Sequence, residues 1–151
     1  MIEVGQSAPG FERVAHEGST ISTRPPLSQV LVLYFYPKDE TAGCTAQACA
    51  FRDSFEAFKD AGAIVVGVSD DSLETHRSFA EHRRLPFPLL ADESGELRKA
   101  FDVPNWLGIL RNRVTFVIDK GGVVRHAFQS QLRATQHVEE ALRIVRQLAH
   151  P

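Results

Sequence analysis

The feature that most constrains the fold is a pair of continuous apolar runs that frame one helical pattern. Val30–Tyr36 reads VLVLYFY and Ala63–Ser69 reads AIVVGVS. Such runs, without polar alternation, are typical of parallel strands covered on both faces. Between them, apolar residues recur at helical spacing from Cys44 to Ala61, and Gly62 provides a helix C-cap signal. The sequence therefore predicts a strand, a crossover helix and a second, parallel strand.

The rest of the chain predicts an α/β fold with a mixed central sheet. The sheet should be parallel through its crossovers and antiparallel at a final hairpin, with helices on both faces. In chain order we expect small strands or loops at a sheet edge over residues 1–28, a polar helix over Ser72–Arg84, a short strand over Phe87–Ala91, a short helix over Ser94–Phe101, a hairpin over Val114–Asp119 and Val123–Phe128, and an amphipathic C-terminal helix around Val138–Leu148.

Composition limits the classes of protein to which the chain can belong. Its 151 residues, 43% of them hydrophobic, suit one globular domain over residues 1–151. The formal net charge is −2 and no basic stripe is present, which argues against nucleic acid as a partner. The N-terminus lacks a basic, apolar secretory signal, and every apolar run is shorter than the roughly 20 residues of a membrane helix. Two cysteines are too few for a secreted disulfide framework, so we expect a cytoplasmic protein.

Chemistry concentrates where the first apolar run ends. Residues 37–45 read PKDETAGCT, and Cys44 lies where a new helix should begin. We expect its thiol to be exposed both to solvent and to the positive end of that helix, which favours the reactive thiolate. Cys49 follows five residues later, a placement that suggests a redox cycle. The alternative for Cys44 is an inert, small core residue. A metal site is not expected, because the C-x₄-C spacing is too wide and no histidine pair accompanies it.

The residues around Cys44 resemble a known family. YFYPKDETAGCT, residues 34–45, is similar to the active-site signature of the peroxiredoxins, with Pro37 and Thr41 spaced before the cysteine. The continuation ACAFRD, residues 48–53, narrows the resemblance to the peroxiredoxin Q, or bacterioferritin-comigratory, subfamily. Further matches at residues 67–72, 87–92 and 113–119 extend it over about residues 30–128, with a weaker match at 8–11. The chain is thus identified as a single AhpC/TSA-type domain with a thioredoxin-like fold.

Two departures from the family pattern stand out. Ala42 occupies a position where the family commonly has proline, and alanine also suits the start of a helix. Residues 104–112 have no counterpart in the pattern, and we expect them to wall the substrate entrance.

The resemblance implies a peroxidase that needs no cofactor and reduces hydrogen peroxide and organic hydroperoxides. Cys44 would be the peroxidatic residue and would become a sulfenic acid. Arg113 would stabilise its thiolate and bind the peroxide oxygens. Thr41 would accept a hydrogen bond from the substrate and donate one to it, and Pro37 would shield the thiolate from water. Backbone N–H groups of Gly43 and Cys44 would complete a cradle for developing negative charge.

The resemblance also implies that Cys49 resolves the sulfenic acid as an intramolecular Cys44–Cys49 disulfide. Relatives carry the resolving cysteine at this position or at the one matching Ala80. In an intact helix the two Cα atoms would lie about 8–9 Å apart, beyond the roughly 7 Å limit for a disulfide, so the helix would have to unwind. Thioredoxin or a similar dithiol would then reduce the bond, and a monomer would suffice. The alternative for Cys49 is burial as a core residue.

Several neighbours of the motif allow two interpretations. Gln47 matches a position that orients the arginine in relatives, or it is an exposed helical glutamine. Arg52 and Asp53 form a local ion pair or anchor the helix that carries Cys44. We expect Asp39 and Glu40 to point to solvent, because they would repel a thiolate.

Side chains outside the motif are expected to be structural. Most of the six histidines should be solvated, and Phe35, Phe116 and Trp106 should belong to the core or to a pocket wall.

Two other functions fit the same cysteines. One is a dithiol–disulfide oxidoreductase, although such proteins usually carry C-x-x-C. The other is a thiol-based redox sensor or chaperone-like binding module that uses helix unwinding as a switch.

Overall fold

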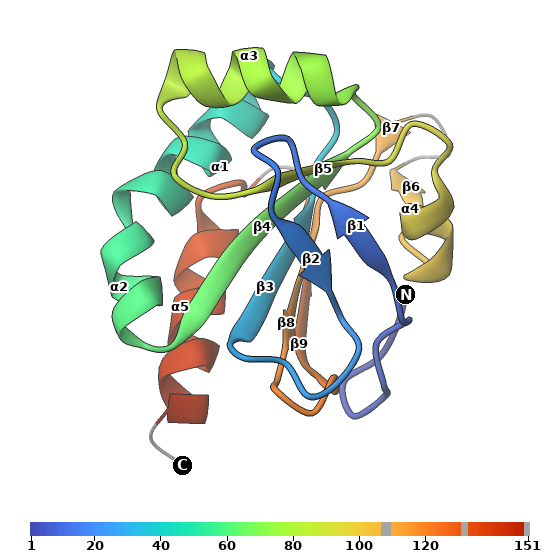
Figure 1. Cartoon of the computed structure of the whole chain (residues 1–151), viewed down its shortest axis with the longest axis vertical. Coiled ribbons are helices and arrows are strands. Elements are labelled where there is room, and N and C mark those ends of the chain that lie inside the picture. Colours follow the sequence, from blue (N-terminus) through green and yellow to red (C-terminus); the bar gives the residue numbers. More distant parts are fainter. Residues whose placement is uncertain (107–109, 131–132, 150–151) are drawn as a thin grey trace.

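The computed structural model of the chain describes residues 1–106, 110–130 and 133–149, without the side chains of residues 105–111. Nine strands and five helices are assigned within these residues (Figure 1). In chain order they are β1 Glu12–Val14, β2 Thr20–Ser22, β3 Val30–Phe35, α1 Ala42–Asp53, α2 Phe55–Asp60, β4 Ala63–Ser69, α3 Leu73–Arg83, β5 Leu89–Ala91, α4 Glu96–Ala100, β6 Asn105–Trp106, β7 Leu110–Arg111, β8 Val114–Ile118, β9 Val124–Gln129 and α5 Gln136–Ala149.

A five-stranded sheet in the order β5-β4-β3-β8-β9 forms the centre of the molecule. β3 pairs in parallel with β4, and β4 with β5, whereas β8 pairs antiparallel with both β3 and β9. The mixed sheet is therefore confirmed, with parallel pairs at the crossovers and antiparallel pairs at the hairpin. Since β8 runs opposite to β3, its first residue, Val114, lies opposite Phe35 at the end of β3.

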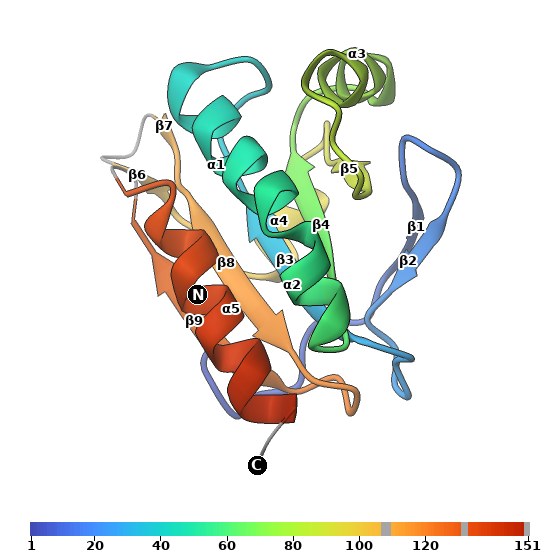
Figure 2. The same cartoon turned by 90° about the vertical axis from the view of Figure 1, so that its left-hand side faces the viewer.

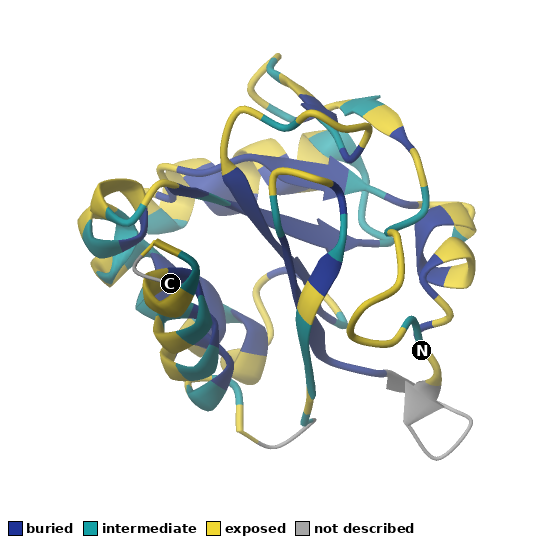
Figure 3. Ribbon diagram, turned by 90° about the horizontal axis from the view of Figure 1, so that it is seen from below, coloured by how far each residue is buried: buried dark blue, intermediate teal, exposed yellow. Residues whose placement is uncertain are grey.

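Alternate residues of β3 build two separate halves of the core. Val32 and Tyr34 point into a cluster with α1, α2, α3 and α5, whereas Leu33 and Phe35 point into a cluster with α4 and the β1–β2 hairpin. Figure 2 shows α1, α2 and α5 side by side on one face of the sheet. All six residues of β3 are buried, and Figure 3 shows the central strands as the buried layer between helices with exposed outer faces. The prediction of a strand covered on both faces is confirmed.

Two local predictions need correction. The helix expected from Cys44 to Ala61 begins earlier, at Ala42, and is interrupted at Ser54 into α1 and α2. The small strands expected near the N-terminus form a separate two-stranded sheet. Its side chains pack on a face of the main sheet. The hairpin also bonds the edge strand β5: His16 N–H donates to Leu89 O, Leu89 N–H donates to His16 Nδ1, and Arg13 Nη1 donates to Ala91 O. The polar helix was predicted closely: Ser72 is its N-cap and Arg84 its C-cap.

Two further expectations concern the rest of the chain. Among the described residues, no helix is both long enough and apolar enough to cross a membrane. In the segment 104–112, expected to wall a substrate entrance, residues 107–109 and the side chains of 105–111 lie outside the described residues, so this expectation stays a prediction. The described part pairs β6 with β7, and Asn112 is buried.

Close packing at Gly67 generates a test of the core. A Cβ atom at this position would lie 2.8 Å from Tyr34 Cζ and 2.8 Å from Leu89 Cδ2. Because both neighbours are fully buried, Gly67→Ala should lower the free energy of unfolding by about 1–3 kcal/mol. Chemical denaturation measures this loss. Gly10→Ala, whose new methyl would make only ordinary contacts with Arg24, should stay within about 0.5 kcal/mol of the parent. Equal effects of the two changes would contradict the packing argument.

Candidate active site

The loop between β3 and α1 delivers Cys44 to the carboxyl end of the sheet. Thr41 is the extended N-cap of α1, and Cys44 is the third helical residue. The first helical hydrogen bond runs from Thr45 N–H to Thr41 O, at 2.8 Å. The N–H groups of Ala42, Gly43 and Cys44 therefore precede the helical ladder, and they carry the positive end of the helix dipole.

Cys44 is buried, which corrects the expectation of a solvent-exposed thiol. Its exposed fraction is 1%, and it belongs to the same core cluster as Tyr34, Ala48 and Phe51. The preceding residues 41–43 are exposed, so the chain turns inward at the cysteine. The sulfur consequently lies just beneath the surface, a position that suits a small reactant better than a protein.

Arg113 reaches the first turn of α1 from a segment far away in the sequence. It directly precedes β8 and is only 3% exposed. Its Nη2 lies 3.0 Å from where a Cβ of residue 43 would be, so Gly43 leaves the space that the guanidinium occupies. Its Nη1 donates a hydrogen bond to Gln47 Oε1 at 2.5 Å. Gln47 is fully buried, which confirms its interpretation as the residue that orients Arg113.

The side chain of Tyr34 lies close enough to Cys44, Asp39 and Arg113 for all three to affect its ionisation. Its ring stacks on Phe51, with centroids 4.6 Å apart. Burial is the main cause that raises the pKa of Tyr34, and nearby Cys44 and Asp39 raise it further, while Arg113 opposes them. The phenol therefore stays protonated beneath the site. The sequence indicated only a buried strand residue here.

Thr41 and Pro37 occupy the outer side of the site. Thr41 is exposed, and its hydroxyl donates to Lys38 O at 2.8 Å. Because that hydrogen is engaged, the hydroxyl oxygen can accept a hydrogen bond from a ligand, but in this conformation it does not donate one. Pro37 is half-buried at the start of the same loop.

Cys49 is half-buried in the middle of the uninterrupted helix α1, and both cysteines are free thiols. The far end of the helix is fixed by Arg52. Its Nε pairs with Asp53 at 3.0 Å, and its Nη1 donates to Arg83 O of α3 at 2.7 Å. Both interpretations of Arg52 are thus correct, since the side chain forms a local ion pair and also anchors the helix.

Of the two acidic residues in the loop, only Glu40 points to solvent as expected. It pairs with His82 at 2.7 Å and with Arg83 at 3.1 Å, and the hydrogen bond from His82 is the main cause that lowers the pKa of Glu40. For Asp39 the expectation is wrong: its carboxylate is fully buried and contacts Tyr36 and His76.

The histidines also differ from expectation. His76 and His137 are fully buried, and only His82 of those described is exposed. Sequence patterns missed both buried rings, because each is stabilised by partners distant in sequence. Phe35 and Phe116 are core residues as expected, and the side chain of Trp106 lies outside the described residues.

Arg98 of α4 was not identified from the sequence. Although it belongs to a helix rich in charged residues, its guanidinium is buried. Nη1 donates to Asn112 O at 3.1 Å and Nη2 to Tyr36 O at 3.4 Å. The side chain therefore joins the residue before Pro37 to the residue before Arg113.

His137 of α5 supports Arg113 through Ser130. Its Nε2 lies 2.9 Å from Ser130 O, which can only accept, so Nε2 carries the proton. Its Nδ1 then accepts from Thr115 Oγ1 at 2.8 Å. Ser130 N–H in turn donates to Arg113 O at 3.2 Å. Burial lowers the pKa of His137 to about 4, which keeps the ring neutral near the guanidinium.

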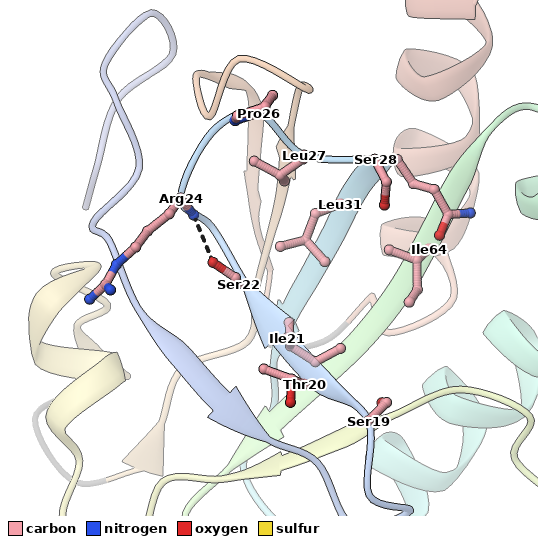
Figure 4. Close-up of a pocket in the computed structure, with 11 residues that line it drawn as sticks. Ser19, Thr20, Ile21, Ser22, Arg24, Pro26, Leu27, Ser28, Leu31 and Ile64 are labelled. Atoms are coloured by element: carbon pink, nitrogen blue, oxygen red, sulfur yellow. Dashed lines mark hydrogen bonds between the residues drawn. The ribbon is translucent and has the colours of Figure 1, made fainter.

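A separate hollow of about 370 Å³ lies at the opposite end of the parallel strands. It is bounded by β2 and by the first residues of β3 and β4, including Leu31 and Ile64, while Arg24 points away from them (Figure 4). Neither cysteine lines it. Cys44 and Arg113 lie instead at the edge formed by the carboxyl ends of the parallel strands, where ligands usually bind in α/β sheets.

Known proteins share this architecture over nearly the whole chain. The sequence model of the AhpC/TSA family matches residues 4–127. The chain is 47% identical to the chloroplastic peroxiredoxin Q of Sedum lineare over 145 residues, which span 95% of this chain and 78% of that protein. It resembles the crystal structure of peroxidoxin BcpB from Mycobacterium tuberculosis with a TM-score of 0.88 and 35% identity, over 98% of this chain and 99% of that one.

A further solved structure is the Xanthomonas campestris bacterioferritin comigratory protein, described with its alkyl peroxide reduction activity. It has a TM-score of 0.82 and 31% identity, and the likeness covers 92% of each chain. The expected thioredoxin-like fold is confirmed.

The buried, neutral state of His137 generates a prediction about pH. The unfolded chain takes up a proton at this residue below about 6.5, whereas the folded chain stays neutral down to about 4. The unfolded state thus binds more protons in this interval, and stability should decrease as the pH falls through it, by up to about 3 kcal/mol. Denaturation curves of the parent and of His137→Gln between these pH values measure the effect. The variant should show the shallower decrease, and identical slopes would contradict the assignment. Arg146→Gln, at an exposed position on α5, is the control, because arginine does not titrate in this interval.

Proposed function

We propose a function from the premise that this chain belongs to the AhpC/TSA family and, within it, to the peroxiredoxin Q group. The function is thiol-dependent reduction of peroxides, with Cys44 as the peroxidatic residue. The observation that carries the proposal is the position of Arg113 against the first turn of α1, the turn that contains Cys44, where Gln47 holds the guanidinium. A fixed cation and free helix amides beside a sulfur are the groups that displacement on an O–O bond requires.

In the first step the Cys44 thiolate attacks the terminal oxygen of ROOH. An S–O bond forms, the O–O bond breaks, and the leaving RO⁻ takes a proton to become ROH, so that Cys44 becomes a sulfenic acid. Arg113 and the N–H groups of Gly43 and Cys44 stabilise the negative charge that moves onto the peroxide oxygens. Thr41 Oγ1 accepts the hydrogen bond of the peroxide O–H. Pro37 limits access of water.

In the second step Cys49 attacks the Cys44 sulfur, an S–S bond forms and water leaves. The helix α1 is continuous from Ala42 to Asp53, so about 8–9 Å separates the two Cα atoms by helix geometry, and the bond needs local unwinding. We expect the unwinding to stop before Ser54, where α1 ends, because Arg52 at this end of the helix is bonded to α3. At position 80 of α3, the other location of a resolving cysteine, this chain has alanine.

The cycle closes when thioredoxin or a similar dithiol reduces the disulfide by thiol–disulfide exchange. Hydrogen peroxide and organic hydroperoxides are the proposed substrates, in keeping with the alkyl peroxide activity named for the Xanthomonas protein. An intramolecular disulfide requires no second subunit, so we predict that the protein is a monomer. We also predict that it is cytoplasmic. The curated relative from Sedum lineare is named chloroplastic, a location that belongs to that protein.

Burial of Cys44 favours this function over protein disulfide exchange. A peroxide is small enough to reach a sulfur beneath the rim of residues 41–43, whereas a protein disulfide needs an accessible thiol. The oxidoreductase therefore remains a secondary hypothesis. The redox sensor would use the same oxidation of Cys44 and stays a separate prediction.

Two cysteine variants test the cycle. Cys44→Ser should abolish peroxide turnover, because the attacking sulfur is absent. Cys49→Ser should permit one rapid oxidation of Cys44 and then stop thioredoxin-driven turnover, because no disulfide can form. Stopped-flow oxidation, steady-state NADPH consumption with thioredoxin and its reductase, and thiol mapping by mass spectrometry measure these effects.

The outcomes separate the two parts of the proposal. Parent-level turnover by Cys44→Ser would overturn the peroxidase assignment. Full thioredoxin-driven turnover by Cys49→Ser would leave that assignment intact and overturn the role of Cys49.

A further inference from the structure

We propose that His76 is a positioning residue for the peroxide reaction: it binds Asp39 and thereby fixes the loop that carries Pro37 and Thr41. The inference rests on the proposed function and adds a residue from α3 to the groups that determine its rate.

The contact between the two side chains is short and completely enclosed. His76 Nδ1 lies 2.6 Å from Asp39 Oδ2, and neither side chain is exposed. The other ring nitrogen, Nε2, lies 2.9 Å from Leu90 O of β5. The ring therefore connects the loop before α1 to the sheet behind it.

The chemistry of the partners determines how many protons the pair holds. Leu90 O can only accept, so Nε2 carries a hydrogen. A second proton must lie between Nδ1 and Asp39 Oδ2, since two lone pairs would repel each other at 2.6 Å. That proton makes the pair either an imidazolium with a carboxylate or a neutral imidazole with a carboxylic acid. In both cases the pair is neutral overall, which makes its burial tolerable.

Asp39 is held by two further elements. Tyr36, the residue after β3, donates a hydrogen bond from Oη to Asp39 Oδ1 at 2.5 Å. The backbone N–H of Asp39 donates to Asp71 Oδ2 at 2.8 Å, and Ser69 Oγ, the last residue of β4, donates to the same oxygen at 2.7 Å. With His76, three bonds fix this one residue of the loop.

Asp39 and Thr41 are two residues apart in the chain, so the position of Asp39 constrains that of Thr41. Glu40 between them has a φ of 65°, a left-handed conformation that is uncommon without glycine and reverses the chain. The Thr41 hydroxyl closes the turn on Lys38 O, the residue before Asp39. Release of Asp39 would therefore move the hydroxyl oxygen that accepts the peroxide O–H.

The same group of atoms does not suggest a metal site. Asp39, Asp71 and His76 place possible ligand atoms within 4.8 Å of one another. Asp39 and His76 are bonded directly, however, and Asp71 Oδ2 already accepts two hydrogen bonds. The cluster is satisfied internally and acts as an anchor.

The test compares two reactions of Cys44 in a Cys49→Ser background, where Cys44 is the sole thiol. Oxidation by hydrogen peroxide requires Thr41 in place, whereas alkylation by iodoacetamide requires only the sulfur. His76→Phe keeps an aromatic ring and removes both nitrogens. It should lower the second-order rate constant for peroxide by about tenfold or more, because misplacement by about 1 Å can cost about 10²-fold. Alkylation should remain within about twofold of the parent background.

Further variants keep the test decisive if His76→Phe does not fold. Asp39→Ala leaves α3 unchanged and should show the same selective loss. Asp39→Asn should restore most of the peroxide rate, because its amide can donate to a neutral His76 and still accept from Tyr36. Glu81→Ala, at an exposed position on α3, is the control and should react like the parent background.

A peroxide rate within twofold of the parent background in folded His76→Phe or Asp39→Ala would overturn the inference. A parallel fall of both reactions would also overturn it, since it would indicate a general disturbance around Cys44. Failure of the proposed function is recognised separately, because the unmodified chain itself would then not reduce peroxide.

Discussion

The site depends on one buried ion, the guanidinium of Arg113 at the first turn of α1. A buried charge is costly unless it is paired and hydrogen-bonded, and here Gln47 supplies a direct acceptor. Gly43 supplies the space, because any Cβ there would meet Nη2. Antiparallel pairing of β8 with β3 brings the arginine to the carboxyl end of β3, where α1 begins. The sheet register thus determines which cation lies at the helix turn that contains Cys44.

Around this ion, buried polar side chains from three helices hold the surrounding loops. Arg98 of α4 ties Tyr36 to Asn112, His137 of α5 supports Ser130 and through it Arg113, and His76 of α3 holds Asp39. Each is satisfied by specific partners, which is the condition for burying polar groups without loss of stability. These contacts hold the loop between β3 and α1 in place. The helix α1 itself would have to unwind for the proposed disulfide to form.

Patterns with local causes were predictable from the sequence. The runs at β3 and β4 gave the sheet core, Ser72 marked the start of α3, and the spacing of Pro37, Thr41 and Cys44 located the candidate site. Arg113 and Gln47 came from the family resemblance. What the sequence missed depends on tertiary contacts. Burial of Asp39 and His76 follows from their pairing across 37 residues, and no local pattern reveals such a pair. The burial of Cys44 likewise follows from packing, in the cluster that contains Tyr34, Ala48 and Phe51.

The most direct test of the central claim is the rate constant for oxidation of Cys44 by hydrogen peroxide in Arg113→Gln, measured by stopped flow. Loss of a preorganised group that stabilises the transition state costs about 10²–10³-fold, and the account predicts a fall of that size. Arg143→Gln, an exposed arginine on α5, should leave the rate unchanged. An Arg113→Gln protein that is folded and reacts within twofold of the parent would contradict the account.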